Sequence, residues 1–154
     1  MNEAPVTQFP ILYLLDRPAP SETYIRREIE QLQRKNWPIR ICTLQRGSSP
    51  LKFSFFACPS GYRVRLLSVA LSKVLSELMH RPWFALRLFW RIPQLGPVVW
   101  EVLEDKCELV HAHYAGLAAA FAEILAETVH IPWTCTVHAR DVFEIGRASC
   151  RERV

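Results

Sequence analysis

A continuous apolar run, ILYLL at residues 11–15, limits the choice of fold more than any other feature of this sequence. Pro10 precedes the run and the segment RPAP at residues 17–20 ends it, so the run has the length of one strand. A strand that does not alternate between apolar and polar residues is buried on both faces, as in a parallel sheet covered by helices. The run therefore predicts a central parallel strand.

The residues after this run predict a helix and a second strand. Ser21 is a good N-cap residue, and Ile25, Ile29 and Leu32 recur at the spacing of one helical face. A second apolar run follows at residues 39–44. A strand, a helix and a strand over this length form a βαβ unit, whose two strands are parallel.

The rest of the chain continues this alternation. We expect a strand at residues 52–57, helices over 64–78, after Pro82 and over 98–105, a strand at 109–114, a helix at 115–129 and a strand at 131–139. This order predicts an α/β, doubly wound, Rossmann-like fold with a parallel sheet of about 4–5 strands flanked by helices.

The length and composition are those of one globular domain. The chain has 154 residues, 50% of them hydrophobic and 22% charged, which excludes a disordered polymer. No apolar run reaches the roughly 18 residues of a membrane-spanning helix, and no secretory signal pattern opens the sequence. Five cysteines without a CxxC pair are typical of a reducing compartment, so we expect a cytoplasmic protein.

Two common phosphate-binding motifs are missing. The sequence contains neither GxGxxG nor GxxxxGK[ST], which argues against a classical dinucleotide fold and against a P-loop. The N-terminus of the first helix still offers backbone N–H groups to a phosphate or a sugar hydroxyl. In the alternative interpretation, Ser21 only caps that helix and Glu22 only interacts with its dipole.

Polar residues follow the predicted strands. Ligands of doubly wound sheets bind at the carboxyl ends of the strands. The residues expected at that edge are Asp16, Ser21, Glu22, Thr23, His113, Tyr114, His138, Arg140 and Asp141.

Three histidines are candidates for chemistry. His111 and His113 lie two residues apart, so they share one face of a strand and form half of a zinc site, but no further ligand at a suitable spacing is visible. We therefore expect no metal, with His111 packed in the sheet and His113 closer to a cleft. His138 ends an apolar strand and can hold a substrate hydroxyl, with Asp141 setting its tautomer, unless Asp141 only caps the next helix.

Residues 61–97 hold six arginine and lysine side chains against one carboxylate, interleaved with leucines and aromatic residues. Such a segment suits an anionic membrane surface, although nucleic acid also binds arginine and aromatic side chains, and ordinary core helices show the same pattern. The candidate membrane-surface residues are Arg63, Arg65, Lys73, Arg81, Trp83, Arg87, Trp90 and Arg91.

Three segments together resemble the N-terminal domain of glycosyltransferase family 4, in the branch that builds colanic acid and other exopolysaccharides. They are PSETYIRREIEQL at residues 20–32, VHAHYA at 110–115 and TVHARDVF at 136–143. Their order and spacing match the family pattern, and the resemblance covers residues 11–144. Tyr24 and Tyr114 stand where phenylalanine is more usual.

The resemblance implies the N-terminal half of a GT-B enzyme. Such an enzyme moves a sugar from a nucleotide-sugar donor to an acceptor with retention of configuration, without a required metal or other cofactor. It further implies that Ser21, Glu22 and Thr23 line the cleft opposite the donor phosphates, with His138 near the transferred sugar and Asp141 beside it. His113 is a weaker substrate-binding candidate. The implied partners are a nucleotide-sugar, a glycan or lipid-linked acceptor and the inner face of the plasma membrane, and no nucleic acid.

The same resemblance predicts the domain organisation. Residues 1–9 are a lead-in, residues 10–144 are part of the acceptor-side domain, and the donor domain with its E-x7-E motif is missing. The segment IGRASCRERV at residues 145–154 resembles a translated sequencing adapter, so we expect it to be non-native. A chain without a donor domain is expected to be inactive in sugar transfer.

Two other function classes stay open at this point. The first is a non-catalytic α/β module that binds a membrane surface or a partner through residues 61–97. The second is a metal hydrolase that uses His111, His113 and His138, which predicts stoichiometric zinc.

Overall fold

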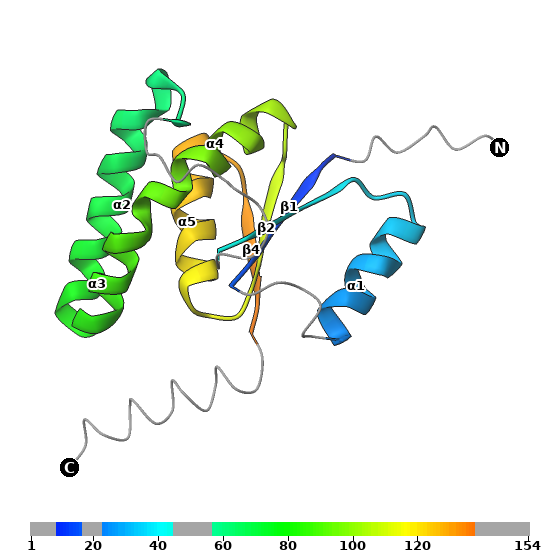
Figure 1. Ribbon diagram of the computed structural model, residues 1–154, viewed down its shortest axis with the longest axis horizontal. Helices are drawn as coiled ribbons and strands as arrows, with labels where there is room; N and C mark the ends of the chain where they lie inside the picture. Colours follow the sequence, from blue (N-terminus) through cyan, green and yellow to red (C-terminus); the bar gives the residue numbers. More distant parts are fainter. Residues whose placement is uncertain (1–8, 17–22, 45–56, 138–154) are drawn as a thin grey trace, which may run out of the picture.

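The computed structural model describes residues 9–16, 23–44 and 57–137. In these residues strands and helices alternate as the sequence predicts (Figure 1). The elements are β1 (Ile11–Leu15), α1 (Thr23–Arg34), β2 (Ile39–Thr43), α2 (Ser60–His80), α3 (Pro82–Arg91), the 3₁₀ helix η3 (Ile92–Gln94), α4 (Leu95–Glu104), β3 (Leu109–His113), α5 (Leu117–Val129) and β4 (Trp133–Thr136).

The four strands form one parallel sheet in the order β2-β1-β3-β4. β1 lies at its centre, where Tyr13 pairs with Ile41 on one side and with His111 on the other. Four of the five β1 residues are buried, as the unbroken apolar run predicts. The predicted α/β class with a Rossmann-like parallel sheet is confirmed.

Helices cover the two faces of the sheet unequally. Figure 1 shows α1 on one side and α2, α3, α4 and α5 on the other. On the first side, Ile25 and Ile29 of α1 pack with Tyr13 and Leu15 of β1. The larger core lies on the second side and includes Leu12, Leu14, Leu66, Leu88, Val98, Val110, Phe121 and Leu125.

The helices that precede β2, β3 and β4 end in the same way. Asn36, Lys106 and His130 have left-handed backbones, with φ of 61°, 52° and 61°. The next amide then donates to the carbonyl five residues earlier, as in Trp37 N to Leu32 O at 3.0 Å. This bond is part of the Schellman motif, which stops a helix and turns the chain into the next strand.

Some predicted boundaries differ from the observed ones. α4 begins at Leu95, earlier than the predicted residue 98, because a proline such as Pro97 is tolerated in the first turn of a helix. β4 is described only as Trp133–Thr136, within the predicted segment 131–139. The predicted strand at residues 52–57 falls outside the described residues except for Ala57.

Candidate functional site

The carboxyl ends of the strands form the edge at which the sequence predicts a site. β1, β3 and β4 end there at Leu15, His113 and Thr136. The chain leaves β1 toward β2 on one side, whereas β3 lies on the other side of β1, so this edge contains the point at which the strand order reverses. Such a point is the usual ligand-binding crevice of an open α/β sheet.

The structure describes two of the predicted catalytic and substrate-binding residues. Thr23 is the first residue of α1, and His113 is the last residue of β3. Ser21, Glu22, His138, Arg140 and Asp141 lie outside the described residues, so their roles stay predictions.

His113 is more buried than we expected. Its exposed fraction is 0%, whereas His111, which was expected to be packed, is only half-buried. The Nε2 atom of His113 lies 3.7 Å from Oε2 of Glu28, and its ring lies 5.7 Å from the ring of Tyr13. The His113 ring is therefore shielded from solvent and does not line an open cleft.

Glu28 lies beside His113, and the sequence analysis did not predict it as a site residue. It lies on α1 and accepts a 2.9 Å hydrogen bond from the hydroxyl of Tyr13 on its other carboxylate oxygen. Burial and this bond raise the pKa of the Tyr13 hydroxyl, so it remains a donor. The spacing from Ile25 places Glu28 beside the apolar stripe of the helix, which is the signal that could have identified it.

His111 is held between two threonine hydroxyls of β4. Its Nδ1 atom lies 2.7 Å from Thr134 Oγ1, and its Nε2 atom lies 3.2 Å from Thr136 Oγ1. Burial lowers the pKa of His111, and the smaller effect of Glu28 opposes this shift. The neutral imidazole is thus favoured, with one nitrogen as donor and the other as acceptor.

The same residues partly meet the requirements of a metal site. One ligand atom each from Glu28, His111 and His113 lies within 4.8 Å of the others, so α1 supplies the third ligand that the sequence analysis did not find. Two imidazoles and a carboxylate are a set that zinc accepts. However, one Glu28 oxygen already accepts the hydrogen bond from Tyr13, and both nitrogens of His111 already hydrogen-bond to the two threonine hydroxyls. We interpret the cluster as a hydrogen-bond network.

Tyr114 has a strained backbone directly after β3. Its φ is 73°, which is rare for an aromatic residue and costs energy that neighbouring contacts must offset. Its amide donates to Thr136 O at 3.0 Å, and its hydroxyl meets the hydroxyl of Tyr24 on α1. Such strain is typical of functional sites.

Comparisons with protein-family models, curated proteins and solved structures found no match to this chain. The structure therefore establishes the fold class of this chain and no narrower relationship.

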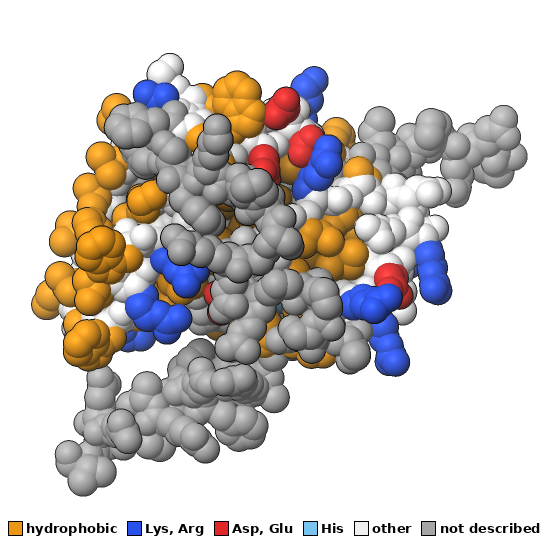
Figure 2. Space-filling view, viewed as in Figure 1, with side chains coloured by type: hydrophobic (Ala, Val, Ile, Leu, Met, Phe, Trp, Pro, Cys, Tyr) orange, Lys and Arg blue, Asp and Glu red, His pale blue; other side chains and the backbone are white. Residues whose placement is uncertain are grey.

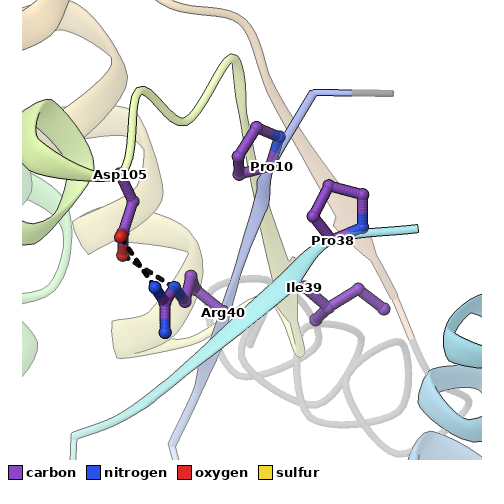
Figure 3. A pocket seen from close by; sticks show the side chains of 5 residues that line it. All are labelled: Pro10, Pro38, Ile39, Arg40 and Asp105. Atoms are coloured by element: carbon purple, nitrogen blue, oxygen red, sulfur yellow. Dashed lines mark hydrogen bonds and ion pairs between the residues drawn. The ribbon is translucent and has the colours of Figure 1, made fainter. Parts of the chain in front are cut away.

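A pocket of about 350 Å³ lies at the opposite edge of the sheet, beside the amino ends of β1 and β2 (Figure 3). It is lined by Pro10, Pro38, Ile39, Arg40 and Asp105. The Nη2 and Nε atoms of Arg40 each bind one oxygen of the Asp105 carboxylate at 2.8 Å. This edge is not where doubly wound folds bind ligands, and its one guanidinium is already paired, so we do not assign the site here.

The predicted membrane-surface residues lie in different settings. Five of them contact the rest of the protein: Arg63 with Cys58 O, Arg65 with Glu127 O, Lys73 with Glu123, Arg81 with Glu77, and Arg91 with Leu44 O. Of these five, Arg65 and Arg81 are still exposed, as are Trp83, Arg87 and Trp90. The sequence could not show which of the cations are engaged within the fold. Within the described residues, no helix has the length and hydropathy to cross a membrane.

Proposed function

We propose that this chain is the acceptor-side part of a retaining glycosyltransferase that transfers a sugar from a nucleotide-sugar to a surface polysaccharide. The observation that carries the proposal is the meeting of the three motif segments at one edge of the sheet. Glu28 of the first segment lies 3.7 Å from His113 of the second, and His113 pairs in register with Thr136 of the third. These segments resemble family 4 motifs in that same order.

The network at this edge supports a binding role. Tyr13, Glu28 and the two threonines fix both imidazoles, and the strained Tyr114 follows directly. A rigid base of this kind supports a site built from the segments that follow β1, β3 and β4. In the proposal, Ser21, Glu22, Thr23 and Asp141 bind substrate hydroxyls and phosphates, and His138 lies beside the transferred sugar.

The proposal requires the donor nucleotide to be bound by a second domain. Its test is an assay of the product of the intact gene, with labelled UDP- and GDP-sugars and lipid-linked glycan acceptors. We expect transfer that is lost in His138→Ala and kept in Trp100→Ala, a substitution at an exposed residue of α4. An intact gene without a second βαβ domain and an E-x7-E motif would contradict the proposal.

A second candidate is a non-catalytic α/β module that binds a membrane surface. The observation that favours it is the exposed apolar face of α2 and α3. Such a module would bind lipid vesicles but would neither bind an acceptor glycan nor support transfer, so the two candidates are separated by the assay above.

A further inference from the structure

One surface of the molecule is apolar and uncovered. α2 and α3 are joined only by Arg81 and lie side by side on the outside of the larger helical layer (Figure 1). Figure 2 shows hydrophobic side chains gathered along this side, with arginine or lysine beside them. We define the outer face by its exposed residues Val64, Leu67, Leu71, Leu75, Leu78, Trp83, Leu86, Phe89 and Trp90.

The outer face is a second apolar stripe, distinct from the one that forms the core. On α2, Leu66, Ala70 and Val74 are buried toward the protein. Leu67, Leu71 and Leu75 recur at the same spacing on the exposed side. The exposed fractions reach 81% at Val64, 79% at Trp83 and 73% at Trp90. A contiguous exposed apolar surface on this scale indicates a contact with a membrane or a partner.

Cationic side chains outnumber carboxylates on the two helices of the outer face. The only carboxylate between residues 57 and 91 is Glu77. Glu77 is turned inward, where it binds Arg81 at 2.7 Å and lies 3.7 Å from Lys73. Lys73 is in turn paired with Glu123 of α5 at 2.6 Å. The exposed cation beside the apolar stripe is therefore Arg87 of α3, because the charge of Arg81 at the turn is already balanced by Glu77.

The charge on the outer face favours an anionic membrane over a second copy of the chain as its partner. A second copy docked through the same face would bring Arg87 toward the Arg87 of the other copy. A surface of anionic headgroups over acyl chains matches both the cations and the apolar stripe. Tryptophan also favours the boundary between headgroups and chains, which is where Trp83 and Trp90 would lie.

We propose that the outer face of α2 and α3 docks the chain in the interface of an anionic lipid bilayer, with the two helices parallel to the membrane plane. This inference goes beyond sugar transfer and does not depend on it. Docking requires only the α2–α3 surface, whereas the proposed transfer requires the carboxyl edge of the sheet.

Vesicle binding of the whole chain tests this proposal. Flotation with phosphatidylcholine vesicles that contain about one quarter phosphatidylglycerol should show binding about tenfold or more stronger than with phosphatidylcholine alone, and added salt should weaken it. Tryptophan emission should shift to the blue on binding. Equal binding to both vesicle types, or none to either, would overturn the proposal.

Matched variants locate the contact. Trp83→Ala with Trp90→Ala should reduce binding about tenfold or more, whereas Trp100→Ala, which also removes an exposed indole, should leave binding unchanged. Arg87→Glu should weaken binding to anionic vesicles more than Arg27→Glu on α1 does. Circular dichroism checks that each variant is folded. The proposal fails if the paired variants behave alike, or if the outer-face variants abolish a dimer and leave vesicle binding intact.

Discussion

Glu28 of α1 contacts both Tyr13 of β1 and His113 of β3. One of its oxygens accepts the Tyr13 hydroxyl at 2.9 Å, and the other lies 3.7 Å from His113 Nε2. This contact ties α1 to two neighbouring strands at the edge where the site is proposed. It makes Glu28 a positioning residue for that edge.

Removal of the Glu28 carboxylate should therefore destabilise the fold. In Glu28→Ala the partly buried Tyr13 hydroxyl loses its acceptor, which costs about 1–3 kcal/mol of unfolding free energy. Glu28→Gln retains an acceptor for Tyr13 and should lose less. Urea denaturation measures both changes.

Glu30 on the same helix provides the control for this prediction. Its ion pair with Arg26 is exposed, so Glu30→Ala should cost no more than about 0.5 kcal/mol. Equal losses from Glu28→Ala and Glu30→Ala would show that the contacts with Tyr13 and His113 contribute little.

Stability should fall in mild acid because of His111. Burial lowers its pKa below the ordinary value of 6.5, so between the two pKa values the unfolded chain binds more protons than the folded one. The contribution of His111 is then fully present above pH 6.5 and is lost as the pH falls through this window. We expect a lower urea midpoint at about pH 5.5 than at about pH 7.5.

Substitution of His111 isolates this effect from other titrations. His111→Gln keeps a polar group between Thr134 and Thr136 but does not titrate, so its urea midpoint should change less between the two pH values. His80→Gln, at the exposed end of α2, should keep the wild-type dependence. A His111→Gln profile as steep as that of the wild type would exclude His111 as the cause.

Zinc should not copurify with the chain in stoichiometric amounts. Glu28, His111 and His113 supply three ligand atoms, but both His111 nitrogens already hydrogen-bond to threonine hydroxyls, and one Glu28 oxygen already accepts from Tyr13. Elemental analysis after dialysis should therefore find well under one zinc per chain. One equivalent of zinc that survives dialysis, and that is absent from His113→Ala, would instead identify a metal centre.

Local periodicity predicts most of this fold, and sequence-distant contacts explain what it missed. Residues 11–15 and the stripe Ile25, Ile29 and Leu32 specify their elements by their own pattern, and the structure agrees. The partnership of Glu28 with His113 depends on the pairing of β1 with β3, which no local pattern encodes. For the same reason, the composition of residues 61–97 could not separate the inward Lys73 from the exposed Arg87.

The left-handed backbone of Lys106, after the end of α4, should lower the free energy of unfolding. Lys106 adopts φ of 52°, and the Cys107 amide after it donates to Val102 O at 2.9 Å. A side chain makes this conformation unfavourable, and glycine removes the clash while it increases the freedom of the unfolded chain. Lys106→Gly should therefore raise the unfolding free energy by about 0.5–1 kcal/mol, measured by urea denaturation.

Lys35 provides a matched comparison, since it follows α1 but is not among the residues with positive φ. Glycine at residue 35 gains no relief from strain and increases the freedom of the unfolded chain, so Lys35→Gly should lower the unfolding free energy by about 0.5–1 kcal/mol or more. Opposite signs for the two substitutions are the expected result, because only Lys106 has a left-handed backbone that glycine can relieve. If both lower stability equally, the left-handed turn after α4 carries no strain that glycine can relieve.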